Sequence, residues 1–188
     1  YILSELCPAN VWEYMHNYTA GSIPEHTVLS MFSGMCLAVH YLHSQHPPIA
    51  HRDIKIENFL LTSSHVKLCD FGSCTTHHWT PTSTAEILAA EDDIACNTTL
   101  PYRAPEQVNV YLGHKLSEKV DIWALGVLLY VMATYTLPFQ TNNVTEPLAI
   151  LNNNFNWLSN VTYSSDYCSL IRYLMDSAPA SRHSIHDE

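Results

Sequence analysis

Two short segments concentrate polar residues that could handle a phosphate group. Residues 51–58 read His-Arg-Asp-Ile-Lys-Ile-Glu-Asn and include Asp53, Lys55 and Asn58, and Asp70 follows twelve positions after Asn58. Carboxylate and amide oxygens are the hard ligands that Mg²⁺ prefers, a carboxylate can accept a proton, and an ammonium group can neutralise phosphate charge. Taken singly, Asp53 could cap a helix and Asp70 could end a strand, so only their joint spacing indicates chemistry.

The residues between these segments predict the element that holds them together. Phe59-Leu60-Leu61 and His65-Val66-Lys67-Leu68 are two short apolar or alternating runs, joined by Thr62-Ser63-Ser64. This pattern is typical of a β-hairpin. Because the strands of a hairpin lie side by side, Asn58 and Asp70 are expected on one side of a cleft.

The other elements are predicted to be mainly helical. Residues 11–18 have a short helical pattern, residues 22–25 have the S-x-x-E form of a capping box, and apolar residues recur at helical spacing from there to about His43. Residues 122–133 are apolar on all sides, which is typical of a buried central helix, and the run is shorter than the about 20 residues that span a bilayer. Residues 1–6 predict a short strand.

Residues 73–100 are mostly polar and show no periodicity, so a long loop is predicted there. A loop of this length in a compact domain is usually functional or disordered. The fold class that follows is mainly α with a small β-hairpin.

Composition narrows the class of protein. The 188 residues suffice for one domain with a substantial core. A formal net charge of −10 without a basic cluster argues against a nucleic-acid partner. The six cysteines include no C-x-x-C pair, which favours a reduced, cytoplasmic setting over a zinc knuckle or a disulfide framework. The adjacent His77 and His78 lack carboxylates or thiols at ligand spacing, which favours loop residues over a metal site.

Three motifs in a fixed order resemble the signature of a eukaryotic serine/threonine protein kinase. Residues 51–58 match the catalytic loop, Asp70-Phe71-Gly72 matches the magnesium motif, and Ala104-Pro105-Glu106 matches the end of the activation segment, which would span residues 70–106. A lone Asp-Phe-Gly triplet would mean little. The three motifs in order, with a hairpin between the first two, are specific.

The resemblance implies a role for each candidate residue. Asp53 would handle the proton of the substrate hydroxyl, and Asn58 and Asp70 would hold Mg²⁺ against the phosphates of ATP. Lys55 would neutralise charge on the γ-phosphate, and its D-x-K-x-x-N context resembles kinases that act on serine and threonine.

Further positions in the second half of the chain match the same resemblance. Thr99 would contact the catalytic aspartate, and Tyr102 belongs to the substrate-facing end of the activation segment. Glu106 would pair with Arg182, and Asp121 would hydrogen-bond the backbone of the catalytic loop.

Longer strings at residues 68–73, 98–106 and 121–139 look like the Numb-associated kinase family. That family includes the adaptor-associated and cyclin-G-associated kinases and phosphorylates clathrin-adaptor subunits. The resemblance implies a cytoplasmic enzyme of endocytic trafficking with a protein substrate, attached to membranes, if at all, through coat proteins.

The same alignment places the nucleotide-facing residues near the start of the chain. Ser4 falls at the gatekeeper position, and Glu5 and Cys7 fall in the hinge whose backbone would bind adenine. Leu60 would pack beneath the adenine ring.

The sequence contains no G-x-G-x-x-G loop and no V-A-I-K-type strand, the parts that hold ATP from above in such kinases. Residues 1–188 are therefore expected to be a partial kinase domain, the hinge and carboxyl-terminal lobe without the amino-terminal lobe, and inactive alone. The alternative is a truncated pseudokinase that acts as a scaffold. Arg52 often accompanies phosphate-dependent ordering of the activation segment, whereas the family resemblance implies an extra helix, expected within residues 111–118.

Overall fold

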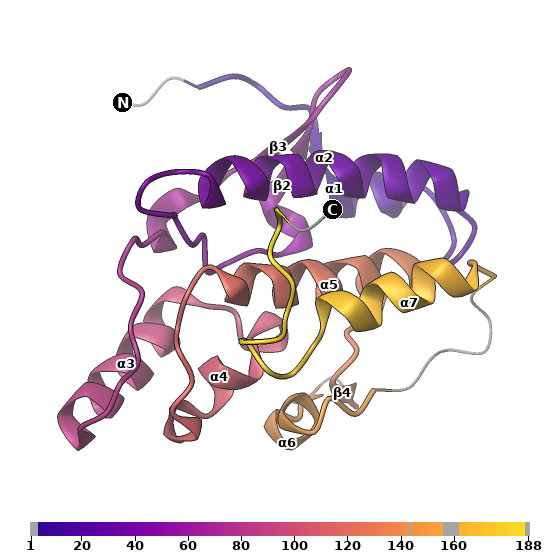
Figure 1. The fold of residues 1–188 in the computed structure, drawn as a ribbon. Coiled ribbons are helices and arrows are strands. Elements are labelled where there is room, and N and C mark those ends of the chain that lie inside the picture. The colour runs from indigo at the N-terminus through magenta and orange to yellow at the C-terminus, as the bar shows by residue number, and fades with distance from the viewer. Residues whose placement is uncertain (1–3, 143, 156–161, 187–188) are drawn as a thin grey trace.

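A computed structural model describes residues 4–142, 144–155 and 162–186 and shows one buried helix at the centre of a helical domain. Helix α5 (Lys119–Thr134) is buried at every position from Val120 to Thr134, which confirms the predicted central helix. Helices α2 (Glu25–His43) and α7 (Ser165–Leu174) pack against it (Figure 1). Gly126 permits the close approach of α7, because a Cβ added there would lie 2.5 Å from Cγ of Met175.

The predicted hairpin forms and is joined by a third strand. Strands β2 (Phe59–Leu61) and β3 (Val66–Leu68) pair antiparallel, with Phe59 opposite Leu68. Strand β1 (Ala9–Asn10), which the sequence did not predict, pairs with the outer edge of β2 to give the order β1-β2-β3. A second small sheet consists of β4 (Gln140–Thr141) and β5 (Val144–Thr145).

The first two helices form where they were predicted but differ from expectation in length or in capping. Helix α1 (Val11–Met15) is shorter than the predicted 11–18 and starts at a capping box in which Asn10 and Glu13 bond each other's backbone N–H groups. The box predicted at residues 22–25 does not form. The Ser22 hydroxyl donates to the carbonyl of Thr19 instead, and the Glu25 carboxylate accepts two hydrogen bonds from Ser164 at 2.6 Å.

The prediction of a long loop over residues 73–100 is wrong, because helix α3 (Thr84–Asn97) lies within it. Ser83 and Glu86 form a capping box at its start, and the buried Ala90 and Ile94 pack against Val110. The extra helix expected within residues 111–118 is not found there, where the structure has only a turn, η4 (Val110–Leu112).

The strand expected at residues 1–6 is not found over its described part, since Ser4, Glu5 and Leu6 have no regular structure; residues 1–3 lie outside the described residues. The remaining elements are the short helices α4 (Pro105–Val108) and α6 (Pro147–Leu151) and the 3₁₀ turns η1 (Ile56–Asn58), η2 (Phe71–Ser73) and η3 (Leu100–Tyr102). The fold is mainly helical with small sheets, as predicted.

Candidate active site

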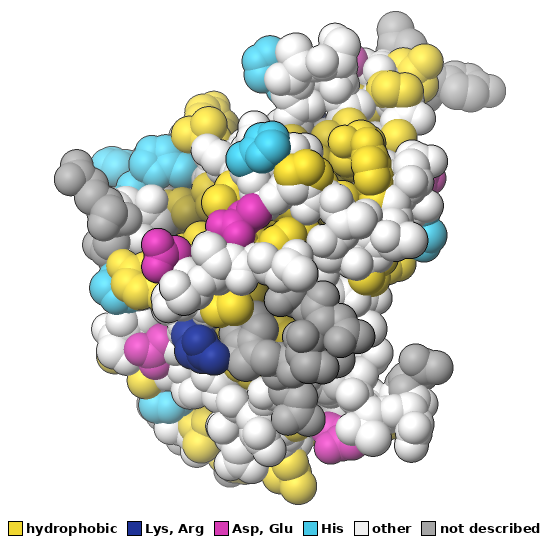
Figure 2. Space-filling view, turned by 90° about the vertical axis from the view of Figure 1, so that its right-hand side faces the viewer, with side chains coloured by type: hydrophobic (Ala, Val, Ile, Leu, Met, Phe, Trp, Pro, Cys, Tyr) yellow, Lys and Arg dark blue, Asp and Glu magenta, His cyan; other side chains and the backbone are white. Residues whose placement is uncertain are grey.

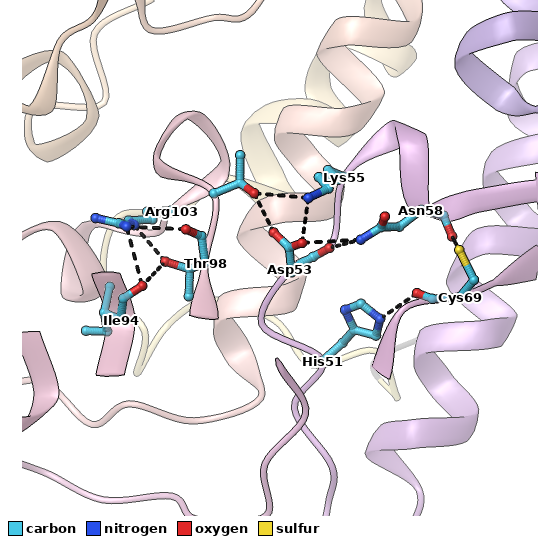
Figure 3. Close-up of polar contacts among 9 residues, drawn as sticks. His51, Asp53, Lys55, Asn58, Cys69, Ile94, Thr98 and Arg103 are labelled. Atoms are coloured by element: carbon cyan, nitrogen blue, oxygen red, sulfur yellow. Dashed lines mark hydrogen bonds and ion pairs between the residues drawn. The ribbon is translucent and has the colours of Figure 1, made fainter. Parts of the chain in front are cut away.

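Asp53 lies at the centre of a hydrogen-bonded cluster (Figure 3). Lys55 Nζ donates to Oδ2 of Asp53 at 2.6 Å, and Thr99 Oγ1 donates to Oδ1 at 2.6 Å. Asn58 Nδ2 donates to the Asp53 carbonyl at 2.9 Å and to Oδ2 at 3.3 Å. Four residues singled out in the sequence, from the 51–58 segment and from position 99, thus meet at one carboxylate.

These contacts keep the Asp53 carboxyl group ionised. Burial by itself would raise its pKa, but the hydrogen bonds from Lys55 and Thr99, the charge of Lys55 and the hydrogen bond from Asn58 outweigh burial and lower the pKa below its ordinary value. An ionised carboxylate in this position can orient a hydroxyl group and accept its proton.

The backbone before Asp53 is held by the buried carboxylate of Asp121 at the start of α5. Its oxygens accept hydrogen bonds from the N–H groups of His51 at 2.7 Å and Arg52 at 2.8 Å, and His43 Nε2 lies 2.9 Å away. This confirms the contact predicted for Asp121. The anchor matters because Arg52 adopts a φ of 70°, a left-handed conformation that a non-glycine residue keeps only where its surroundings enforce it.

Asp70 follows β3 and is held near Asn58 through its neighbour Cys69. The Cys69 N–H donates to the Asn58 carbonyl at 3.0 Å, and His51 Nε2 donates to the Cys69 carbonyl at 3.1 Å. Asp70 itself is exposed and has a φ of 63°. Phe71 is 53% exposed and contacts only the His51 ring, edge to face, among the aromatic pairs described.

Asn58 and Asp70 fit a magnesium ion. Asn58 uses its Nδ2 group for Asp53, which leaves the amide oxygen without a hydrogen bond among the described residues, and the Asp70 carboxylate is open to solvent. Two hard oxygen donors beside an open face match Mg²⁺, which takes one or two side-chain ligands and fills its shell with water and phosphate oxygens.

The residues expected to face the nucleotide base lie next to the small sheet. The Glu5 carboxylate pairs with Lys67 Nζ on β3. Cys7 is half-buried, and Leu60 is half-buried on β2. No described hydrogen bond joins these three side chains to the Asp53 cluster.

The activation segment is tied to the same loop through α3. The Arg52 guanidinium pairs with the Asp93 carboxylate and donates through Nε to the carbonyl of Ser73. Asn97 Nδ2 donates to the other oxygen of Asp93 at 2.8 Å. Asp93 was not singled out in the sequence, although the S-x-x-E pattern at residues 83–86 could have revealed its helix.

The end of the segment is fixed by a buried ion pair. Arg182 Nη1 and Nη2 donate to the two oxygens of Glu106 at 2.7 and 3.0 Å, which confirms the predicted pairing. Arg182 also lies over the Trp123 ring, with the guanidinium carbon 5.3 Å from its centroid. Tyr102 is buried, and burial raises the pKa of its hydroxyl.

A groove of about 670 Å³ opens beside this cluster. Ile56, Glu57 and Tyr102 contribute to one part of its lining, and Leu137 and Phe139 contribute to another. Its lining combines polar and apolar side chains.

The histidine pair of the activation segment forms no metal cluster. His78 Nδ1 lies 3.0 Å from Glu118, and the His77 ring stacks on Trp79. Within the described ranges, no three His, Cys, Asp or Glu side chains are grouped so that they could hold a metal ion.

Lys and Arg side chains are scarce on the face shown in Figure 2. The whole chain has 8 Lys and Arg residues against 18 Asp and Glu residues. None of the helices in the described part of the chain is long and apolar enough to cross a membrane.

Comparisons with known proteins find relatives that are named as kinases. The chain is 46% identical over 167 residues to a probable serine/threonine-protein kinase of Dictyostelium discoideum, covering 88% of this chain and 20% of that protein. A second probable serine/threonine-protein kinase of that organism is 42% identical, covering 100% and 17%. An actin-regulating kinase of Saccharomyces cerevisiae is 35% identical, covering 98% and 23%.

The chain thus spans about a fifth of the length of these relatives. The family described as protein kinase domain matches residues 1–187, which is nearly the whole chain. On that match, and with relatives named as serine/threonine kinases, the chain belongs to the protein kinase domain family.

Proposed function

We propose that this chain carries the catalytic half of a serine/threonine protein kinase, which transfers the γ-phosphate of ATP to a hydroxyl group of a protein. The observation that carries the proposal is the ionised Asp53 carboxylate held by Lys55, Asn58 and Thr99, with Asp70 tied to the same loop through Cys69. Phosphoryl transfer depends mainly on positioned charge, and this cluster supplies it.

In the proposed reaction, the substrate hydroxyl oxygen forms a bond to the γ-phosphorus while the bond from that phosphorus to the β,γ-bridging oxygen breaks. ADP leaves with the electron pair, and the hydroxyl proton passes to Asp53. Lys55, whose Nζ lies between Asp53 and Thr99, would neutralise charge on the transferring group. Tyr102 and Glu106 would position the substrate through the end of the activation segment.

Asn58 and Asp70 would hold Mg²⁺, which would neutralise the phosphates of ATP. Glu5 and Cys7 would contribute backbone groups to the adenine, with Leu60 beneath the ring. These residues form one side of a nucleotide site. We infer that the glycine-rich loop and strand lysine of the other side are supplied by an amino-terminal lobe, so that residues 1–188 form the carboxyl-terminal lobe and transfer negligible phosphate alone.

A phosphotransfer assay tests this proposal in two proteins. One is the 188-residue chain, and the other is the chain joined to the amino-terminal lobe of the S. cerevisiae actin-regulating kinase. We expect Mg²⁺-dependent transfer only from the joined protein, with Asp53→Asn reducing it by about 10³-fold and the exposed control Asp92→Asn leaving it unchanged. Robust transfer by the 188-residue chain would overturn the half-site proposal.

A non-catalytic scaffold is the second candidate function. It is favoured only if the joined protein binds ATP yet transfers no phosphate. A scaffold has no physical need for an ionised carboxylate with three hydrogen-bond donors beside two magnesium-type oxygens, and this is why the kinase is preferred.

We further propose that the substrate is a protein of the endocytic machinery, specifically a clathrin-adaptor subunit. The kinase would act in the cytoplasm and would reach membranes through coat proteins. The proposal rests on the resemblance to the Numb-associated kinases. Incubating the joined protein with radiolabelled ATP and purified clathrin-adaptor complex tests it, with an unrelated phosphoacceptor protein as control. Equal labelling of both would contradict the proposed substrate.

A further inference from the structure

Arg103 is a half-buried cation whose contacts include no carboxylate. Its Nε donates to Thr98 Oγ1 at 2.7 Å, and Nη2 lies 3.3 Å from the Thr98 carbonyl and 3.4 Å from the Ile94 carbonyl. No Asp or Glu oxygen among the described residues lies within ion-pair distance of it. Burial lowers the pKa of this guanidinium, so its charge is held at a cost that its neighbours must offset.

The groups that offset the cost of burying the Arg103 charge belong to the carboxyl-terminal end of α3. The last carbonyls of a helix lack partners within the helix and carry its negative dipole end. Here Thr98 follows the helix in an extended conformation, its hydroxyl donates to the Ile94 carbonyl at 2.6 Å, and Arg103 approaches the same carbonyl. Thr98 and Arg103 together close the end of α3.

The same contacts close a loop around Thr99. The backbone turns through η3, with Tyr102 N–H donating to the Thr99 carbonyl at 2.9 Å and Arg103 N–H to the Leu100 carbonyl at 3.1 Å. The Arg103 side chain then returns to Thr98 (Figure 3). The backbone of Thr99 is therefore fixed on both sides, and its hydroxyl is the group that donates to Asp53 at 2.6 Å.

We propose that Arg103 is a positioning residue for phosphoryl transfer, which clamps the turn carrying Thr99 to the end of α3 and thereby sets the Thr99 hydroxyl against Asp53. Arg103 touches neither Asp53 nor Lys55 in this structure, so it acts through Thr98 and Thr99. This inference rests on the proposed kinase function. It also gives a role to a half-buried charge that lies outside the catalytic motifs.

Substitutions in the joined, active protein test the clamp by steady-state kinetics. We expect Arg103→Met to lower kcat by about 10- to 100-fold, the range for losing a hydrogen bond that holds a charged site, while KM for ATP changes less than about threefold. Arg103→Lys, which keeps a donor for the Thr98 hydroxyl, should recover part of the loss. Thr98→Val should act like Arg103→Met, and Thr98→Ser should be close to wild type. Lys115→Met removes a cation from an exposed loop and should leave kcat unchanged.

A double substitution separates positioning from a structural role. If Arg103 acts through Thr99, then Arg103→Met added to Thr99→Val lowers kcat by less than about twofold further. Effects that multiply would overturn the proposal, as would equal kcat in Arg103→Met and wild type.

Hydrogen exchange gives a readout that does not depend on activity. We expect Arg103→Met and Thr98→Val to accelerate exchange of the Tyr102 and Arg103 amides but not of the α5 amides. Acceleration throughout α5 would show general destabilisation and count against the clamp. If the joined protein transfers no phosphate, the proposed function fails, but the exchange experiment still tests the clamp. Accelerated exchange of the Tyr102 and Arg103 amides in the variants would support the clamp, and unchanged exchange would overturn it.

Discussion

Arg52 of the catalytic-loop segment forms an ion pair with Asp93 of α3, forty-one positions away. In kinases that depend on phosphorylation, an arginine of this type orders the activation segment through a phosphate group. Here a carboxylate on a helix of the segment itself occupies that place, and Asn97 holds the carboxylate from its other side. The sequence left the mode of ordering open, and this contact favours ordering without phosphate.

Asp93→Asn is therefore expected to loosen the activation segment. The side chains of Arg52 and Asp93 are 15% and 48% exposed, so the pair contributes about 0.2–1 kcal/mol, and its loss raises local opening by up to about fivefold. Hydrogen exchange over residues 74–83 measures this effect, with Asp92→Asn on the exposed side of the same helix as the matched control. Equal exchange in the two variants would show that the pair does not order the segment.

The buried pair of Glu106 and Arg182 contributes in a different way. Both side chains are at most 1% exposed, so removing one partner leaves an uncompensated charge in the core. Glu106→Gln or Arg182→Met should each destabilise the protein by about 3–5 kcal/mol, which lowers Tm by about 6–20 °C for a chain of this size. Thermal unfolding followed by circular dichroism measures this change.

The double variant Glu106→Leu/Arg182→Met provides the check on that explanation. Because it removes both charges, it should be less destabilised than at least one of the single variants. A double variant whose loss equals the sum of the two single losses would show that packing, rather than unpaired charge, dominates.

Two identical patterns show how far the sequence could predict the structure. Residues 22–25 and 83–86 both have the S-x-x-E form, but only Ser83 and Glu86 make the capping box. Glu25 is taken by Ser164, which lies 139 positions away, and a local pattern cannot anticipate such a partner. At residues 83–86 the same pattern does begin a helix, but that helix buries only Ala90 and Ile94, so its apolar residues show too little periodicity to reveal it in the sequence.

Some features of the candidate site could likewise be predicted from the sequence and others could not. The hairpin followed from two short apolar runs around a polar turn, whereas the roles of Asp121 and of the Glu106–Arg182 pair followed from motifs whose residue types few alternatives can replace. Asp93 and Arg103 do not belong to the kinase motifs, and both make their contacts through α3. Because α3 was not predicted from the sequence, their contacts could not be predicted either. The short strand β1 was also missed, because two residues carry too little periodicity to be read.

The pKa of Asp53 predicts how stability responds to acid. Because the folded-state pKa is lowered, the ionised carboxylate stabilises the fold at a pH above the unfolded-state pKa of about 4, and this contribution is lost as the pH falls through the folded-state pKa. As the pH falls from about 5 to about 2, the wild type should therefore lose stability relative to Asp53→Asn, whose amide does not titrate. Urea titrations across that range measure this change, and Thr99→Val should reduce it because a donor is lost. A difference that does not vary with pH would contradict the lowered pKa.

The close packing of α7 against Gly126 of α5 can be tested by comparing two glycine-to-alanine substitutions. Alanine in place of Gly126 would bring a Cβ within 2.5 Å of Met175 Cγ and 3.0 Å of Leu174 Cβ, so the two helices must separate. Overpacking of this kind costs about 1–3 kcal/mol, more than the about 1 kcal/mol that alanine gains over glycine in a helix.

Gly34→Ala is the control, because Gly34 also lies within a helix but meets only Val66, with the nearest atoms at 3.3 Å. A shift of a few tenths of an ångström relieves that contact, so the gain in helix propensity should leave Gly34→Ala neutral or slightly stabilised in urea unfolding. Gly126→Ala should be less stable than wild type, by up to about 2 kcal/mol once the gain in helix propensity is subtracted from the cost of overpacking. The close approach of α7 to Gly126 would be disproved by equal stability of the two variants, because both make the same change in helix propensity and differ only in what the added methyl group meets.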